Sequence, residues 1–241
     1  MARSRREKGR ARLSESESGA SPYVLKPQPH SSHSILQRML PRDGAGRRLL
    51  DLGCADGYLS RIFAARGFSV TAIDAPSVRP PSFPPEIQFL EADLDRGLPP
   101  LEAAFDYVIC ADLLEHLRDP DRLLRDVRAR MAPGGRLLAS LPNSGNIYFR
   151  LNVLAGRFPL DDSGLFDRTH VHFYMWKGWN DLLSRNGFRI TAVEATVIPF
   201  SLAAPNHPSL GSSLESLYSL AARAWKKLFA YQFVVSCSIS A

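Results

Sequence analysis

The most informative segment of the chain reads Leu49-Leu50-Asp51-Leu52-Gly53-Cys54-Ala55-Asp56-Gly57-Tyr58-Leu59. It predicts a buried strand, a turn from Gly53 to Gly57 and a helix that starts at Tyr58. A ligand can approach the backbone of such a turn closely, and the first turn of the helix offers unpaired N–H groups. Because Asp51 precedes the turn and Asp56 lies within it, the turn would repel a phosphate and attract a cationic ligand. The segment therefore predicts a binding site for a nucleoside that carries an amino or sulfonium group.

Four further apolar runs extend this pattern into an open α/β sheet. They cover residues 69–73, 87–90, 105–110 and 135–141. Parallel strands covered by helices on both faces read as near-continuous apolar runs of this kind. Asp74 closes the first run, where an acidic residue accepts hydrogen bonds from ribose hydroxyls, and Asp93 follows the second, where an adenine amino group would bind. Ligand-binding groups therefore gather at the carboxyl ends of successive strands.

Together these segments resemble the class I S-adenosylmethionine-dependent methyltransferases, in the branch of the ubiquinone-pathway O-methyltransferases and MetW-like proteins. The matching segments are residues 50–57, 72–74, 91–93, 105–108, 114–117 and 131–135. The resemblance implies an α/β, Rossmann-like fold: a seven-stranded, mostly parallel sheet with an antiparallel last strand and helices on both faces. The remaining elements are expected to be a helix over residues 176–186, a sixth strand over 188–199 and the last strand over 230–240.

The resemblance also implies that the cofactor is S-adenosylmethionine. Eight residues would bind it: Asp51 near the ammonium group, Gly53, Ala55 and Gly57 around the methionine moiety, Asp74 at the ribose, Asp93 and Leu94 at the adenine, and the backbone of Ala111 at the methionine end. An NAD-dependent oxidoreductase would instead show Gly-x-Gly-x-x-Gly, which this turn lacks.

The chain departs from the family pattern at two places. Ala55 stands where the family usually has glycine, and residues 75–85 are too rich in proline for the helix expected there. We expect a stiff loop to cover that face of the adenosine pocket instead. These departures keep open the alternative of a non-catalytic scaffold or regulatory subunit that binds S-adenosylmethionine.

Residues 142–175 form an insertion after the fifth strand that we expect to bind the methyl acceptor. The insertion is apolar and aromatic, and its final run Asp167-Arg168-Thr169-His170 resembles a segment that returns over the active-site mouth. His116 and His170 are the candidate catalytic residues, because a hydroxyl acceptor must lose a proton and histidine titrates near neutral pH. The sequence places His116 at the start of the helix after the fourth strand, so a helix cap is its alternative role. The predicted function is O-methylation of a small or lipid-like acceptor.

A metal site is a second interpretation of the same region. The run Asp112-Leu113-Leu114-Glu115-His116 resembles the metal motif of small-RNA 3′-end methyltransferases, and His170 would supply a fourth ligand. Asp112, Glu115 and His116 would share one face of a helix, where Mg²⁺ would orient a diol. Because Leu-Glu-His-Leu also occurs in enzymes of this branch that need no metal, we expect none. A metal-assisted RNA or catechol-type O-methyltransferase stays the alternative.

The net charge of +6 is concentrated at the N-terminus. Residues 1–12 hold six basic residues and one acidic residue, or +5, which leaves +1 for the rest of the chain. This near-neutral remainder does not favour nucleic acid as the main partner. We expect residues 1–21 to be a disordered basic and serine-rich tail, and residues 22–241 to be the methyltransferase domain.

The cysteines indicate a reducing compartment. Cys54, Cys110 and Cys237 are odd in number, widely spaced and without metal-type pairs, so we expect them to be reduced core residues. No apolar run reaches the ~18 residues of a membrane-spanning helix, and we recognise no signal peptide. The expected location is the cytoplasm.

Residues 200–229 are expected to form a helical insertion before the last strand. One face of this helix is predicted to be apolar and to pack as a lid or homodimer element, with the residues Leu214, Leu217, Ala221, Ala224 and Leu228. The alternative is peripheral contact with a membrane that holds a lipid-like acceptor, through Trp225, Lys226, Lys227 and Phe229.

Overall fold

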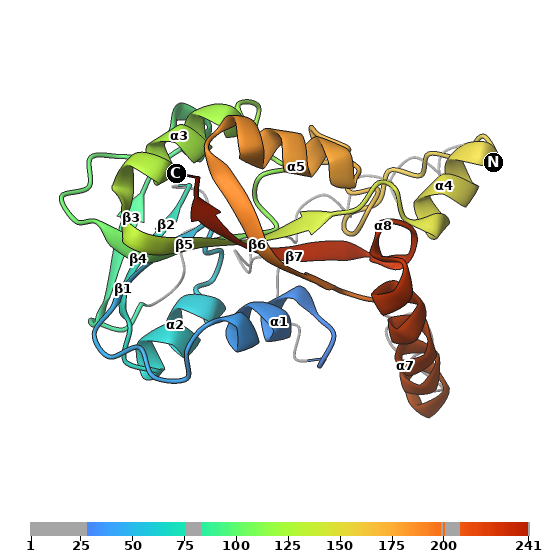
Figure 1. Cartoon of the computed structure of the whole chain (residues 1–241), viewed down its shortest axis with the longest axis horizontal. Helices are drawn as coiled ribbons and strands as arrows, with labels where there is room; N and C mark the ends of the chain where they lie inside the picture. Colours follow the sequence, from blue (N-terminus) through green and yellow to red (C-terminus); the bar gives the residue numbers. More distant parts are fainter. Residues whose placement is uncertain (1–27, 76–82, 199, 201–207, 241) are drawn as a thin grey trace, which may run out of the picture.

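The computed structural model of the chain describes residues 28–75, 83–198, 200 and 208–240 (Figure 1). The predicted N-terminal tail, residues 1–21, lies outside the described residues. So do residues 76–82 of the proline-rich segment and residues 201–207 of the predicted helical insertion.

Within the described residues, seven strands form one sheet in the order β3-β2-β1-β4-β5-β7-β6. Their bounds are Arg48–Leu52 (β1), Ser69–Asp74 (β2), Ile87–Glu91 (β3), Phe105–Ala111 (β4), Met131–Pro142 (β5), Phe188–Ala195 (β6) and Gln232–Ile239 (β7). The first five strands pair in parallel, and β7 is inserted antiparallel to both β5 and β6. The predicted Rossmann-like fold is confirmed.

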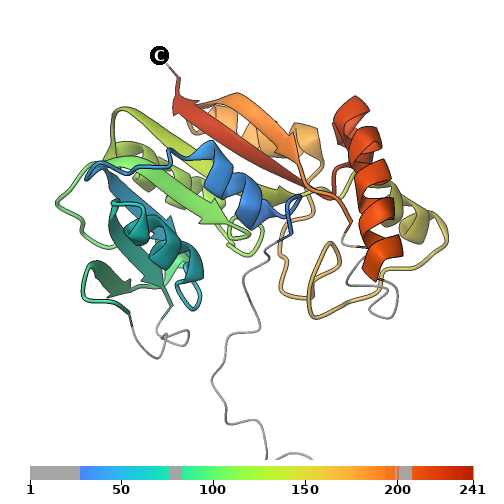
Figure 2. The ribbon, with the colours of Figure 1, turned by 90° about the horizontal axis from the view of Figure 1, so that it is seen from below.

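Helices cover both faces of this sheet (Figure 1). They are α1 (Ser32–Met39), α2 (Tyr58–Ala65), α3 (Pro120–Arg130), α4 (Ile147–Leu154), α5 (Trp176–Arg185), α7 (Pro208–Ala224), α8 (Lys226–Phe229) and the short 3₁₀ helix η2 (Leu94–Arg96). Helices α1 and α2 lie on one face, which is in front when the molecule is seen from below (Figure 2). Helices α3 and α5 lie on the other face, while α4 and α7 stand at one end of the sheet.

Alternation along the strands divides the core between the two faces. In β1, Leu50 and Leu52 pack in the cluster that also holds the apolar residues of α3 and α5. Leu49 faces the other way, into the cluster beneath α1 and α2. Because side chains two residues apart in a strand point to the same face, Asp51 lies on the face of Leu49. It is an acid, but only 1% of it is exposed. A buried carboxylate at this position needs a functional reason.

Helix α7 does not pack its predicted apolar face on this chain as a lid, while a role of that face in a homodimer stays a prediction. The predicted apolar face is exposed: Leu214 by 44% and Leu217 by 67%. The buried side instead carries Glu215, Ser219 and Ala222. Small and polar side chains allow this side of the helix to lie close to the body of the molecule and to line a cavity there. Packing in the folded chain, and not the local apolar pattern, therefore decides which side of α7 is buried. None of the helices in the described part of the chain is long and apolar enough to cross a membrane.

Candidate active site

The glycine turn between β1 and α2 is built from left-handed residues. Gly53, Ala55 and Gly57 have φ angles of 69°, 48° and 76°. The φ of Gly53 favours glycine there, and a Cβ would lie 3.0 Å from Cδ1 of Leu113, which would have to shift slightly. Ala55 adopts the left-handed conformation in spite of its Cβ, which is uncommon for a residue other than glycine, asparagine or aspartate.

Two carboxylates stand beside this turn. Asp74, at the end of β2, accepts hydrogen bonds from the backbone amides of Ala55 and Ala75, both at 2.7 Å. A carboxylate has about four acceptor positions, so Asp74 keeps capacity for two hydroxyl groups of a ligand. Asp51 accepts a hydrogen bond of 2.6 Å from the Ser60 hydroxyl, and its burial raises the pKa to about 7. A cation bound nearby would lower this pKa again.

The other three residues predicted for the cofactor follow β3 and β4. Asp93 caps η2 by accepting from the amide of Asp95, and its second oxygen pairs with Arg96 at 3.2 Å. The side chain of Leu94 is buried in the main core, which leaves only its backbone for a ligand. Ala111 is the last residue of β4.

The segment after β4 is a turn, so the prediction that His116 begins a helix is wrong. Helix α3 starts only at Pro120, where the side chain of Asp119 accepts from the amide of Arg122. Asp112 has a φ of 50°, which turns the backbone out of the strand and prevents a helix from starting there. Asp112, Glu115 and His116 therefore do not share one helix face.

A cavity of about 270 Å³ opens beside this turn, at the carboxyl ends of β4 and β5. Its walls come from four regions: the start of α1, the turn after β4, the insertion and the last part of the chain. Lining residues used below are Asp112, Glu115, His116, Pro142, Leu165, Asp167, His170, Val197, Glu215, Tyr231 and Gln232. None of the eight residues predicted for the cofactor lines this cavity.

His116 is held at the edge of this cavity by a relay of hydrogen bonds. The Thr169 hydroxyl donates to Oδ1 of Asp167 at 2.6 Å. Its single proton is thus used, so it accepts from Nδ1 of His116 at 3.0 Å. Nδ1 also lies 3.2 Å from the carbonyl oxygen of Thr169, a second acceptor. The proton of a neutral His116 is therefore on Nδ1, and Nε2 carries the lone pair.

Asp167 is suited to accept the last hydrogen bond of this relay. Burial opposes its ionisation, but hydrogen bonds from the side chain and backbone of Thr169 outweigh burial and lower the pKa of Asp167. It is therefore a carboxylate at neutral pH and acts as an acceptor.

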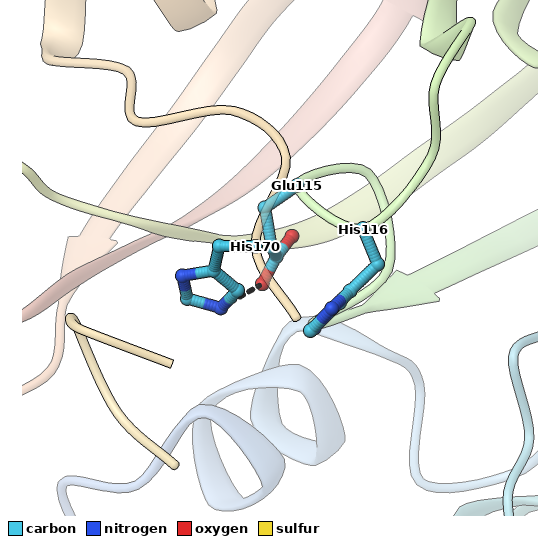
Figure 3. A group of neighbouring side chains, drawn as sticks. All are labelled: Glu115, His116 and His170. Carbon is cyan, nitrogen blue, oxygen red and sulfur yellow. Dashed lines mark ion pairs between the residues drawn. The ribbon is translucent and has the colours of Figure 1, made fainter. Parts of the chain in front are cut away.

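His170 lies against the other two residues, as Figure 3 shows. Burial and the neighbouring His116 lower the pKa of His170 to about 4, so the ring is neutral at physiological pH. Nε2 of His170 is 3.9 Å from Oε1 of Glu115, which is too long for a hydrogen bond, and without a charge the contact is no salt bridge. The Nδ1 atom of His170 is buried without a hydrogen-bond partner.

Glu115, His116 and His170 bring one possible metal-ligand atom each within 4.8 Å of one another. Asp112, the remaining residue of the predicted metal set, is not in this group. Its Oδ1 atom accepts hydrogen bonds from the Ser140 hydroxyl at 2.5 Å and from the Gln232 amide at 2.8 Å. The structure thus brings three of the four predicted metal ligands close together, while the carboxylate of the fourth, Asp112, is hydrogen-bonded to Ser140 and Gln232.

Sequence reasoning missed several residues of the site. Ser140 and Gln232 come from different strands of the sheet, 92 residues apart, and no local motif signals them. Helix α1 is also new, and its residue His33 is 2.8 Å from the Tyr58 hydroxyl at the start of α2. The Asp167-to-His170 run did carry a signal, because its acid and hydroxyl are the groups that form the relay.

Comparison with known proteins identifies the family of this chain. Residues 27–193 match the family model described as a methyltransferase domain. The ubiquinone biosynthesis O-methyltransferase of Paracidovorax citrulli is 31% identical over 136 residues, which cover 53% of this chain and 56% of that protein. Its namesake in a Caulobacter species is 35% identical over 115 residues, 42% of this chain and 46% of that protein. The chain thus spans about half the length of the curated relatives it matches.

Solved structures show the same fold. A methyltransferase from Mesorhizobium loti, described as S-adenosylmethionine-dependent, aligns with a TM-score of 0.57 at 24% identity, over 86% of this chain and 97% of that one. A methyltransferase from Haloferax volcanii, solved in complex with its activator Trm112, aligns with a TM-score of 0.60 at 15% identity, over 88% of this chain and 91% of that one. With the family match over most of its length, the chain belongs to the methyltransferase-domain family, and it has the fold of the class I S-adenosylmethionine-dependent methyltransferases.

Proposed function

We propose that this protein transfers the methyl group of S-adenosylmethionine to a hydroxyl oxygen of an apolar acceptor, with His116 as general base. The observation that carries this proposal is the hydrogen-bond relay from Asp167 through Thr169 to His116. In the reaction an oxygen–carbon bond forms, the sulfur–methyl bond breaks, and the acceptor proton goes to the base. S-Adenosylmethionine supplies an electrophilic methyl group when bound, and S-adenosylhomocysteine is the other product.

The residues around the glycine turn fit this cofactor. Asp74 offers acceptor capacity for two ribose hydroxyls, and the left-handed turn at Gly53 exposes backbone to the methionine moiety. The buried Asp51 supplies the negative charge that an ammonium or sulfonium group requires. We assign adenine to the region of Asp93 and the backbone of Leu94, and the methionine end to Ala111.

His116 is suited to take a proton because its tautomer is fixed. Nδ1 donates to Thr169, so the lone pair of Nε2 is directed away from the relay. Once Nε2 gains a proton, the imidazolium remains hydrogen-bonded through Thr169 to the carboxylate of Asp167. General base catalysis of this kind contributes about 10²–10⁴-fold to a rate. His170 stays neutral beside it.

The acceptor is assigned from the cavity and from the relatives. Pro142, Leu165, Val197 and Tyr231 give the cavity an apolar wall suited to a small or lipid-like molecule. The curated relatives are O-methyltransferases of ubiquinone biosynthesis, which supports a hydroxyl acceptor here.

The buried free cysteines fit a cytoplasmic location. They are Cys54, Cys110 and Cys237.

Cofactor binding is tested by isothermal titration with S-adenosylmethionine, S-adenosylhomocysteine and NAD. We expect micromolar binding of both adenosyl ligands, its loss in Asp74→Ala, and no binding of NAD. The reaction is then tested by following S-adenosylhomocysteine formation with phenol, catechol and polyprenyl-phenol acceptors. His116→Ala should lower kcat by about 10²-fold or more without changing cofactor affinity. Tight cofactor binding without turnover on any acceptor would instead support a scaffold or regulatory role.

Metal-assisted methylation is a second candidate, favoured by the cluster of Glu115, His116 and His170. Two imidazoles and one carboxylate suit Zn²⁺ or Mn²⁺ better than Mg²⁺, which prefers oxygen ligands. Ligands of one zinc ion lie about 3.4 Å apart, so these side chains would have to move closer than they are. The relay at Nδ1 of His116 would orient a metal ligand as well as it orients a base.

One experiment separates the two candidates. Activity of protein treated with EDTA is measured before and after adding back Zn²⁺, Mn²⁺ or Mg²⁺, in the wild type and in Glu115→Gln. A metal-free base mechanism predicts no response to chelation. Loss of activity on chelation and recovery with one metal, absent in the variant, would favour the metal site.

A further inference from the structure

Helix α4 with the loop that follows it, and helix α7 with the residue after it, carry large apolar side chains exposed to solvent. This apolar end of the molecule consists of Tyr148, Leu151, Val153, Leu154, Phe158, Leu160, Leu214, Leu217, Leu220 and Trp225. Their exposure is high for such side chains: 83% for Leu154 and 67% for Leu217. An apolar surface of this extent on a protein in water marks a contact with another body.

The two helices stand at the same end of the sheet in both views (Figures 1 and 2). They are also linked, because the Asn146 side chain at the start of α4 donates to the Tyr218 hydroxyl of α7 at 3.3 Å and to the Ala230 carbonyl at 2.8 Å. Beneath α4, Phe149 stacks on Phe166 with ring centroids 4.4 Å apart. The exposed leucines of α4 therefore sit on a helix whose inner side is fixed by packing.

Basic residues outnumber acidic ones at this end, where the exposed acids are Asp161 and Asp162, and Asp162 pairs with Arg168 at 2.9 Å. The charged residues of 147–160 are Arg150 and Arg157, both exposed. In α7 and α8 the exposed charges are Arg223 and Lys227, while the acidic residue there, Glu215, is buried at 7%. Apolar side chains flanked mainly by basic ones match the boundary between the acyl chains and the head groups of an anionic bilayer. Trp225, exposed by 59% beside Lys226 and Lys227, is the residue type that prefers this boundary.

The apolar end is continuous with the cavity. Glu215 lines the cavity from the buried side of α7, while its neighbours Leu214 and Leu217 face solvent. Leu165 lines it from the insertion that carries α4. Contact of this end with a bilayer would bring the mouth of the cavity close to the acyl region. A lipid-like acceptor would then enter without passing through water.

We infer that α4 and α7 dock this protein on an anionic membrane surface, from which the acceptor is taken. The part of this inference that concerns the acceptor rests on the function proposed above, while the docking itself does not. Binding is peripheral, since the apolar side chains belong to two helices that lie along the end of the molecule.

Vesicle flotation of the full chain tests the inference. The probes are vesicles of phosphatidylcholine alone and of phosphatidylcholine with phosphatidylglycerol. We expect the wild type to float with the anionic vesicles, and Leu154→Glu combined with Leu217→Glu to lower the partition coefficient about tenfold or more. Arg157→Glu with Lys227→Glu should also lower it. The matched control is Arg130→Glu with Arg189→Glu, which changes charge equally on exposed residues of α3 and β6 and should float like the wild type.

All these variants keep the basic residues 1–12, so any binding by that segment is common to them and to the wild type. The inference is wrong if the wild type does not float, or if the leucine variant floats equally well. A wild-type dimer that the leucine variant converts to a monomer, without flotation of either, would show that a second copy covers this end. Titration with S-adenosylmethionine in parallel separates the two proposals, because the leucine variant should bind it as the wild type does.

Discussion

Binding of S-adenosylmethionine should be linked to ionisation of Asp51. This carboxyl is 1% exposed, and burial raises its pKa to about 7. Below that pH it is protonated and neutral, and it cannot attract an ammonium or sulfonium group. Above that pH it is ionised, and a cationic ligand is favoured. Cofactor affinity should therefore rise as the pH increases through 7, and binding at pH 7 should release a fraction of a proton.

The size of the effect follows from the pKa. A carboxyl with a pKa of about 7 is about one tenth ionised at pH 6 and about three quarters ionised at pH 7.5. If only the ionised form binds, affinity rises roughly eightfold over this interval, which is about 1.3 kcal/mol. The interval stops at pH 7.5 because the α-amino group of the ligand begins to titrate near pH 8. His170, with its pKa lowered to about 4, does not contribute in this range.

The assay is isothermal titration with S-adenosylmethionine at pH 6.0, 6.5, 7.0 and 7.5. Phosphate and Tris buffers differ in ionisation enthalpy, so the heats at pH 7 give the number of protons released, expected to be about one half. Asp51→Asn keeps an acceptor for the Ser60 hydroxyl and should bind more weakly, with an affinity that does not change with pH. A flat wild-type profile, or the same slope in Asp51→Asn, would refute the assignment of Asp51 to the cation.

Three further substitutions probe other parts of the site. Gly53→Ala should lower the free energy of unfolding in urea by about 1–2 kcal/mol, because its φ of 69° disfavours a Cβ; unchanged stability would contradict the left-handed turn. Thr169→Val should lower kcat about tenfold or more and alter the pH–rate profile, while Thr169→Ser should leave kcat and the profile unchanged. Equal rates for the two variants would contradict a catalytic role of the relay to His116. Trp179→Phe should lower stability by about 1–3 kcal/mol in thermal unfolding, because the buried carbonyl of Pro142 loses its donor at 2.7 Å; an unshifted Tm would show that the carbonyl finds another partner.

Residues that directly follow an apolar run were the easiest to predict. Gly53, Asp74 and Asp93 could be placed at strand ends because apolar runs fix the strands, and the carboxyl ends of parallel strands share one edge. The error at His116 was avoidable. Asp119 followed by Pro120 is a strong signal for the start of a helix, and it contradicts a start four residues earlier.

Contacts between distant parts of the chain could not be predicted. Gln232 reaches Asp112 only because β7 is inserted beside β5, and no local pattern in either segment encodes that meeting. For helix α7, the apolar pattern identifies a helix but does not say which side faces protein. Glu215 lies on the buried side that faces the cavity, and that cavity exists only in the folded chain.

The position of β7 also sets the order in which this site can be completed. β5 and β6 do not pair with each other; β7, which follows both in the chain, lies between them. Until β7 has been synthesised, β5 and β6 present unpaired backbone edges, and Asp112 lacks the Gln232 amide. A nascent chain that ends before Gln232 therefore has the glycine turn but not the acceptor cavity. During translation, the ability to bind the cofactor should therefore appear before the ability to bind the acceptor.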